Sequence, residues 1–380
     1  MALFTSWEYL LFLTFSVLFF YLVNIRWRSI VLAFTGIVFY LMHAGIYVLL
    51  IIFEARAYFL AKHKKKYFFI VSLLLSISIL VFFKYRFLFF GFFPESTWIF
   101  PLGISFFTFE FIHYLVDGYH NKIEEPKLKD HFAFIFFFPT MIAGPIKRYQ
   151  QFVPQIYSSE FSWDNILTGT FRIVIGFVKK IAIADTLALL SDSLSDMPFV
   201  MNASPVDIAI RLVAFSFKIY MDFSAYSDIA LGSAALFGIY LPENFNWPYL
   251  ARNIGDFWKR WHISLTSWFM DYVYKPLGGS RVILSLTLLN VLIVMVLSGL
   301  WHGAGWNFLV WGLYHGFLLA GYHLYKHSGL PDFPLWIAIP LTFIAVTLGW
   351  VFFMAPLDIA VVIFAKLWNG FLDFIIFLLS

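Results

Sequence analysis

Residues 282–300 read VILSLTLLNVLIVMVLSGL and contain no charged side chain. A helix needs roughly 20 such apolar residues to cross the hydrocarbon core of a bilayer. Other apolar runs, such as Phe132–Phe138 and Val351–Phe353, also lack the alternation of apolar and polar residues that is typical of a membrane β-barrel. Because helices satisfy their backbone hydrogen bonds internally within lipid, these runs predict membrane-spanning helices.

The composition of the whole chain points the same way. Of its 380 residues, 61% are hydrophobic and only 13% are charged, whereas a soluble domain carries about 25% charged residues. A soluble fold of this composition would expose very large apolar patches. This excludes a soluble enzyme, a nucleic-acid-binding protein and a disordered chain, and it predicts an all-α polytopic membrane protein. The formal charge of +4 fits Lys and Arg in cytoplasmic loops, so no nucleic-acid partner is expected.

Clusters of positive charge predict the topology of the N-terminal part. Arg26 and Arg28 follow the first apolar run, and Lys62–Lys66 contains the strongest positive cluster. The positive-inside rule places both groups in the cytoplasm, so an even number of crossings separates them and the N-terminus lies outside. The stretch Ser29–Ala61 then forms two spans that turn at residues 43–45. Each has roughly 15 residues, which is shorter than usual and predicts a thinned membrane region.

No second composition regime and no internal repeat divides the chain, so residues 1–380 are expected to form one membrane domain. The segment Asn253–Arg281 mixes charged and aromatic residues, which predicts an interfacial or re-entrant layer ending in a turn at Pro276–Gly279. The further expected spans are Tyr67–Phe83, Ile99–Val116, His131–Ala143, Gly169–Leu190, Pro205–Met221, Ser224–Tyr240, Val282–Leu300, Trp306–Tyr325, Leu335–Phe353 and Ile359–Leu379. Several contain polar residues or end in proline and glycine, so re-entrant or broken helices are the alternative to full crossings.

Ionisable groups at membrane depth are costly, which makes them functional candidates. His302 follows the apolar run 282–300, and Gly299, Gly303 and Gly305 around it permit a broken helix beside a cavity. A neutral imidazole in that position can act as a base. A structural histidine bonded to a carbonyl is the alternative, and the glycines together with Trp301 favour the functional interpretation. Trp301 is therefore a candidate substrate-binding residue.

A second histidine, His262, lies in the stretch 257–262 beside Lys259 and Arg260. The pattern alone favours an aromatic and basic stripe that anchors the chain at the membrane interface. The functional alternative is a donor-side histidine, with Lys259 and Arg260 contacting the phosphates of a nucleotide-bearing or carrier-linked donor.

A third polar patch covers Tyr220–Asp228. Asp222 and Tyr226 are spaced i, i+4, as are Ser224 and Asp228, so each pair lies on one helix face. A hydrogen-bonded contact between helices is the favoured interpretation. The second interpretation is the lining of a polar cavity, which makes Asp222 and Tyr226 candidate substrate-binding residues.

Several chemistries find no support in the sequence. The chain has no Cys, which excludes a thiol nucleophile and a cysteinyl-acyl intermediate. No HExxH motif occurs and His315 is not at i, i+4 from His302, so no metal site is expected. GxSxG, P-loop and GxGxxG motifs are also missing from the sequence.

An ordered series of motifs runs along most of the chain: PLGISFFTF (101–109), IAGPIKRY (142–149), DFSAYSD (222–228), LPENFN (241–246), FWKRWHISL (257–265), DYVYKPLGG (271–279) and GLWHG (299–303). The series resembles the membrane-bound O-acyltransferase (MBOAT) family, in its bacterial branch of alginate O-acetyltransferase AlgI-like and teichoic acid D-alanyltransferase DltB-like proteins. The resemblance implies the MBOAT fold, a ring of about eleven membrane helices with a thinned centre and a transmembrane tunnel. It makes His302 the essential residue in the tunnel and His262 a second important histidine toward the cytoplasm.

The activity implied by the resemblance is acyl transfer from a cytoplasmic thioester to hydroxyls of an exported cell-envelope or secreted polysaccharide. A hydroxyl needs a base within hydrogen-bond reach, so neutral His302 is expected to take its proton. His262 is expected to orient or polarise the thioester carbonyl. The donor, acetyl-CoA or an acyl carrier protein, is a substrate, and no bound cofactor is expected. Expected partners in the bacterial cell membrane are lipid and either an extracytoplasmic SGNH-type acyltransferase or a small membrane peptide.

The sequence leaves other activities open. Residues 274–281 resemble the AlgI-like pattern, which favours acetyl, whereas the length is nearer to DltB-like members, which leaves D-alanyl transfer to teichoic acid open. A transporter or flippase for a lipid-linked group would line its path with Asp222 and Asp228, but no half-to-half repeat supports it. Intact His262 and His302 argue against a non-catalytic scaffold.

A single cysteine tests the expected topology, because the chain has none of its own. His63→Cys lies in the positive cluster, so it should resist an impermeant thiol reagent on intact cells and react after lysis. Thr5→Cys, near the N-terminus, should react from outside in the same assay. Labelling of His63→Cys on intact cells would contradict the topology.

Overall fold

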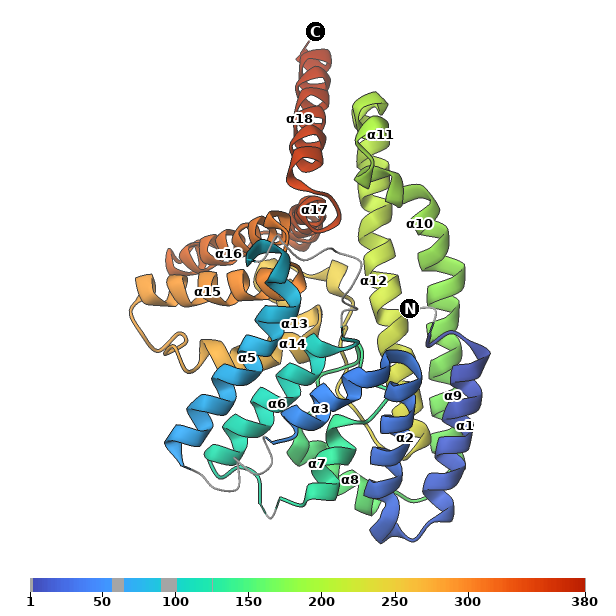
Figure 1. Cartoon of the computed structure of the whole chain (residues 1–380). Coiled ribbons are helices and arrows are strands. Elements are labelled where there is room, and N and C mark those ends of the chain that lie inside the picture. The colour runs from blue at the N-terminus through green and yellow to red at the C-terminus, as the bar shows by residue number, and fades with distance from the viewer. Residues whose placement is uncertain (1–2, 57–64, 90–100, 125, 380) are drawn as a thin grey trace. The chain divides into compact units, whose positions relative to one another are not determined.

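The computed structural model describes residues 3–56, 65–89, 101–124 and 126–379, and every regular element in these ranges is a helix (Figure 1). The expected all-α class is therefore confirmed. The chain forms two compact units, unit 1 from Met1–Phe177 and Ala225–Glu243, and unit 2 from Val178–Ser224 and Asn244–Ser380. Because one helix, α12 (Pro205–Leu236), contributes to both units, the expectation of a single membrane domain stays a prediction.

The helices of unit 1, besides the C-terminal part of α12, are α1 (Trp7–Leu22), α2 (Arg28–Ala44), α3 (Val48–Glu54), α5 (Lys66–Phe89), α6 (Ile104–Tyr119), α7 (Leu128–Ile135), α8 (Tyr149–Ser158) and α9 (Trp163–Phe177). Unit 2 contains the N-terminal part of α12 and two π-helical segments, Val178–Ala184 and Met270–Tyr274. Its other α-helices are α10 (Asp185–Ser191), α11 (Met197–Asn202), α13 (Ile254–Arg260), α14 (Ile263–Phe269), α15 (Leu284–His302), α16 (Trp306–His327), α17 (Leu335–Met354) and α18 (Leu357–Leu379).

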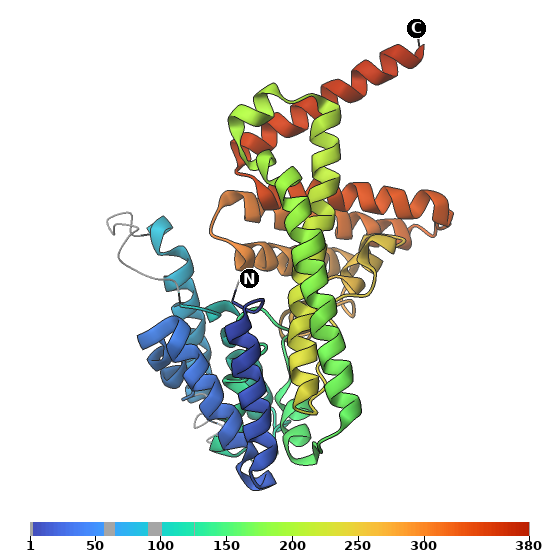
Figure 2. The same ribbon diagram turned by 90° about the vertical axis from the view of Figure 1, so that its right-hand side faces the viewer.

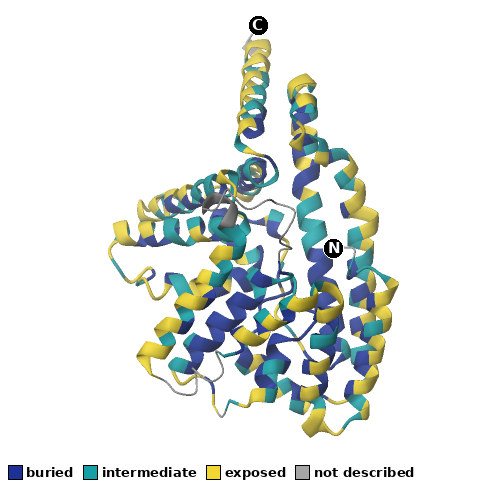
Figure 3. Ribbon diagram, viewed as in Figure 1, coloured by how far each residue is buried: buried dark blue, intermediate teal, exposed yellow. Residues whose placement is uncertain are grey.

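Several helices are long and apolar enough to cross a membrane. In the described ranges these candidate spans are Ile25–Glu54, Lys66–Tyr85, Leu284–His302, Leu335–Met354 and Leu357–Leu378. Many of their large apolar residues are exposed, as the yellow parts of α18 show in Figure 3, and Phe377 of α18 is 75% exposed. Lipid in place of water explains such exposure. The membrane class is confirmed, and the count of about eleven spans and the tunnel stay predictions.

Two of the expected spans, Pro205–Met221 and Ser224–Tyr240, prove to be one helix. The residues of α12 continue without a break through the polar patch Tyr220–Asp228. The patch holds no proline or glycine, and its carboxylates are paired with cations of neighbouring helices, Asp222 with Lys180 and Asp228 with Arg172. Polar character alone therefore does not end this helix.

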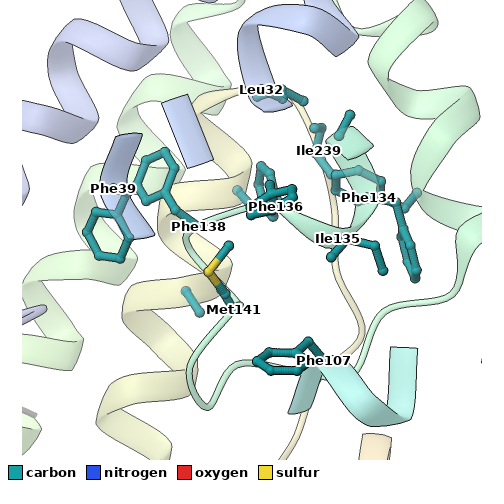
Figure 4. Close-up of a cluster of buried hydrophobic side chains, with 14 of the residues drawn as sticks. Leu32, Phe39, Phe107, Phe134, Ile135, Phe136, Phe138, Met141 and Ile239 are labelled. Atoms are coloured by element: carbon teal, nitrogen blue, oxygen red, sulfur yellow. The ribbon is translucent and has the colours of Figure 1, made fainter. Parts of the chain in front are cut away.

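The expected span His131–Ala143 is wrong, because α7 ends at Ile135 and the chain continues as turns. Pro139 lacks a backbone N–H and disfavours a helical conformation in the residue before it. The phenylalanines of this segment, Phe136 among them, fill the core of unit 1 (Figure 4). A Cβ on Gly36 of α2 would lie 1.6 Å from the carbonyl oxygen of Phe136, so only glycine admits the turn here.

The two short spans expected in Ser29–Ala61 are confirmed only in part. Helix α2 ends at Ala44, in the predicted turn, and Gly45 after it has a positive φ of 53°. The next helix, α3, has only seven residues, too few to cross a bilayer. Residues 57–64, which include Lys62 and Lys64, lie outside the described residues.

Glycines set the spacing of the hairpin that ends in His302. Helices α15, α16 and α17 pack successively against each other and lie close together in Figure 2. A Cβ on Gly299 would lie 2.3 Å from the carbonyl oxygen of Phe308, and one on Gly312 would lie 2.5 Å from that of Met295. Backbone approach of this kind is typical of membrane helices, where small residues replace the hydrophobic effect as the basis of packing.

A matched pair of substitutions on α16 tests this packing. Gly312→Ala should lower the free energy of unfolding by about 1–3 kcal/mol, because the new methyl group meets backbone. Gly321→Ala, whose Cβ would have no neighbour within 4 Å, should keep or raise thermal stability in detergent, since Ala favours the helix. Equal melting temperatures for the two variants would show that the close contact is not needed.

Candidate functional site

The layer predicted at Asn253–Arg281 is built from short helices. The side chain of Asn253 accepts a hydrogen bond of 2.8 Å from the Asp256 N–H and so caps α13. Between α13 and α14 the chain turns at His262, which has a left-handed backbone with φ of 46°. Asn244 fixes the turn, because its carbonyl accepts the Ile263 N–H at 2.9 Å. Left-handed backbone costs a residue other than glycine about 1–2 kcal/mol and is frequent at functional sites.

A pocket of about 220 Å³ in unit 2 contains both predicted histidines. Its residues come from the N-terminal part of α12, from the turn after α13, and from α15, α16 and α17. They combine two imidazoles and one carboxylate with a largely aromatic wall, and they are Ile219, Asp222, Phe223, Trp261, His262, Trp301, His302, Trp311, Trp350 and Phe353. The fold thus brings Asp222, His262, Trp301 and His302 together from three separate stretches of sequence.

Aromatic rings hold the two imidazoles in place. The ring centre of His302 lies 4.7 Å from that of Trp301, 5.0 Å from that of Trp311 and 5.0 Å from that of Phe353. The His262 ring lies 4.6 Å from that of Phe223 and 6.1 Å from that of Trp301. Trp301 therefore contacts both histidines, which supports its choice as a site residue.

His262 is buried with an unused hydrogen-bonding capacity. Its exposed fraction is 1%, and neither ring nitrogen has a hydrogen-bond partner among the described residues. Burial lowers the pKa of His262, which lies outside the five candidate spans, to about 3, so the imidazole is neutral. A buried polar group left without a partner costs about 1–3 kcal/mol. Its presence at a pocket points to a ligand or a chemical role.

Asp222 reaches the pocket from α12 and is held by a lysine that the sequence pattern did not single out. The Lys180 Nζ lies 2.8 Å from the Asp222 Oδ1 and 2.7 Å from the Asp185 Oδ1. Lys180 is far from Asp222 in sequence and follows no motif, so only folding identifies it. Trp311 and Phe353 were likewise not predicted, and no group of three or more His, Asp or Glu that could hold a metal occurs among the described residues.

Lys259 and Arg260 line a different and larger pocket of about 800 Å³, also in unit 2. Arg252 joins them, and the Arg260 Nε pairs with the Asp256 Oδ1 at 2.8 Å. The remaining wall is mainly apolar, and it includes Leu265, Phe269, Val291, Met295 and Leu319. Ser298, which also lines this pocket, precedes His302 by one turn of α15.

Tyr226 belongs to unit 1 and is not among the residues that line either pocket. It is buried, and its hydroxyl accepts a hydrogen bond of 3.3 Å from the Ala143 N–H. Its ring packs on Phe4 at 4.7 Å. In the same unit, Arg172 pairs with Asp228 at 3.0 Å and with Glu243 at 2.6 Å. These contacts support the interpretation of this half of the patch as a contact between helices.

Comparison with known proteins agrees with the motifs. The profile of MBOAT, the membrane-bound O-acyltransferase family, matches residues 99–357. The match covers more than half of the chain and includes both predicted histidines. The chain therefore belongs to the membrane-bound O-acyltransferase family.

Three curated proteins illustrate the range of its relatives. The peptidoglycan O-acetyltransferase of Helicobacter pylori is 36% identical over 333 residues, which cover 77% of this chain and 62% of the relative. A probable alginate O-acetylase AlgI of Pseudomonas aeruginosa is 40% identical over 259 residues, with 67% and 49% covered. The teichoic acid D-alanyltransferase of Bacillus subtilis is 31% identical over 280 residues, with 68% and 70% covered. The chain thus spans between about half and three fifths of the length of the Helicobacter pylori and Pseudomonas aeruginosa relatives.

The backbone at His262 leads to a prediction that separates stability from chemistry. His262→Asn keeps a residue that tolerates left-handed backbone, so it should fold with a melting temperature near that of the unaltered protein and still lose most use of the acyl donor. His262→Ala should be less stable than His262→Asn by about 1–2 kcal/mol. Thermal unfolding in detergent measures the difference, and equal stabilities would mean that the turn imposes no such strain.

Proposed function

We propose that the protein is a membrane O-acyltransferase that moves an acetyl group from a cytoplasmic thioester toward hydroxyls of an exported cell-envelope or secreted polysaccharide. The single observation that carries the proposal is the pocket shared by His262 and His302. Two imidazoles at one small cavity, in a chain of this family, are the groups that acyl transfer to a hydroxyl requires.

The reaction assigns a separate role to each histidine. Neutral His302 takes the proton of the acceptor hydroxyl, and the hydroxyl oxygen bonds to the thioester carbonyl carbon. The bond between that carbon and sulfur breaks, an ester forms, and His302 returns its proton to the departing thiolate, which leaves as a thiol. The neutral His262 imidazole donates an N–H to the carbonyl oxygen as negative charge develops there. General-base catalysis contributes about 10²–10⁴-fold.

The larger pocket suits the donor. Acetyl-CoA and an acylated carrier protein share a phosphate-bearing pantetheine arm that ends in a thioester. Arg252, Lys259 and Arg260 supply cations for phosphate, and the apolar wall accommodates the arm. Ser298 lies at this pocket one turn before His302, so a thioester that enters here has a short way to the base.

Acetyl is favoured over D-alanyl by the relatives. The two acetylating relatives are 36% and 40% identical to the chain, and the D-alanyltransferase is 31% identical. We place the protein in the bacterial cytoplasmic membrane with the N-terminus outside, among membrane lipid. An extracytoplasmic SGNH-type acyltransferase or a small membrane peptide is the proposed partner that passes the acetyl group onward.

The proposal predicts the behaviour of His302 variants. His302→Ala and His302→Gln should both fold, because one side of the imidazole borders a cavity, and both should lose turnover by about 10²–10⁴-fold. Release of thiol and transfer of label from [¹⁴C]acetyl-CoA in nanodiscs measure turnover per folded molecule, and binding of acetyl-CoA is measured separately. Gln can donate and accept a hydrogen bond but cannot carry the proton, so near-normal turnover of His302→Gln would remove His302 as the base.

A further inference from the structure

The π-helical segment Val178–Ala184 carries Lys180, which pairs with the pocket residue Asp222. This segment interrupts an otherwise continuous helical run between α9 and α10, and π-helical insertions are frequently found at functional sites. The side chain of Lys180 is 18% exposed and that of Asp222 is 28% exposed. The Lys180 Nζ bridges Asp222 and Asp185 at 2.8 and 2.7 Å, so its position is fixed from two sides.

The ion pair holds a carboxylate at the wall of the histidine pocket. Lys180 pairs with the Asp222 Oδ1 at 2.8 Å. Asp222 and His302 line the same cavity of about 220 Å³. When His302 takes a proton its imidazole becomes positive, and an ionised carboxylate at so small a cavity stabilises that charge.

We propose that Lys180 is a positioning residue that holds the Asp222 carboxylate at the histidine pocket, where Asp222 serves as the counter-charge of the protonated His302. The inference rests on the proposed function, because the counter-charge matters only while His302 carries a proton. Lys180 touches no reacting atom. It fixes the position of the Asp222 carboxylate at the pocket.

A second ion pair of unit 2 provides a matched control. Lys218, also on α12, pairs with Asp192 at 2.6 Å, and neither residue lines the histidine pocket. Lys218→Met therefore removes a comparable lysine–aspartate pair without changing the charge at the pocket. A purely structural role of Lys180 predicts the same behaviour for the two lysine variants.

The test uses the full chain in nanodiscs with acetyl-CoA as the probe and measures kcat and KM per folded molecule. Lys180→Met should lower kcat by up to about 10²-fold, because the carboxylate is then no longer held in place at the pocket. The KM for acetyl-CoA should stay unchanged, since the donor pocket is intact. Lys180→Arg should restore most of kcat, and Lys218→Met should keep the kcat of the unaltered protein. Lys180→Met combined with Asp222→Asn should be no slower than Asp222→Asn alone.

Each remaining outcome counts against the inference. A normal kcat in Lys180→Met, no rescue by Lys180→Arg, or an equal loss in Lys218→Met would overturn it. If Lys180→Met does not fold, Lys180→Gln, which retains an amide donor between the two carboxylates, replaces it with the same expectations. If His302→Gln alone keeps near-normal turnover, the proposed function is contradicted instead. The counter-charge role of Asp222 is then contradicted as well, because it depends on a protonated His302.

Discussion

Close contact between α15 and α16 is the constraint on which the histidine pocket depends. Gly299 and Gly312 let the two helices approach until each Cα faces backbone of the other helix. His302 is the last residue of α15, and Trp311 of α16 packs on it at 5.0 Å. In lipid, apolar surface gains nothing by leaving its solvent, so small residues and backbone contact take over the role of the hydrophobic core.

The same principle extends to the third helix of this layer. Gly349 of α17 faces His315, whose Nε2 would lie 2.7 Å from a Cβ at that position. Trp350, the next residue, packs on Trp261 at 4.9 Å and lines the pocket. Aromatic side chains thus form most of the pocket wall. The pocket can be small because glycines let its walls come together.

Sequence reasoning succeeded where a feature is local. The apolar runs at 282–300 and 335–353 and the turn at Ala44 all depend on neighbours in the chain. It failed where tertiary contacts decide. His131–Ala143 was expected to form a span, yet the helix ends at Ile135, and the phenylalanines after it turn into the core of unit 1 before Pro139. The polar patch Tyr220–Asp228 was expected to separate two spans, yet Lys180 and Arg172 pair its carboxylates and α12 continues through it.

By itself, the sequence determined the membrane class, the family and the two histidines, because hydropathy and ordered motifs depend on residue type and spacing alone. It named Trp301 beside His302, and it gave a cavity-lining role for Asp222 only as the second interpretation. Only the tertiary structure decided that His262 and His302 share one pocket, that Lys259 and Arg260 line another, and that Tyr226 lies in the core of unit 1. Only the tertiary structure could identify Lys180. An ion pair between residues far apart in sequence depends on their distance in space and produces no recognisable sequence pattern.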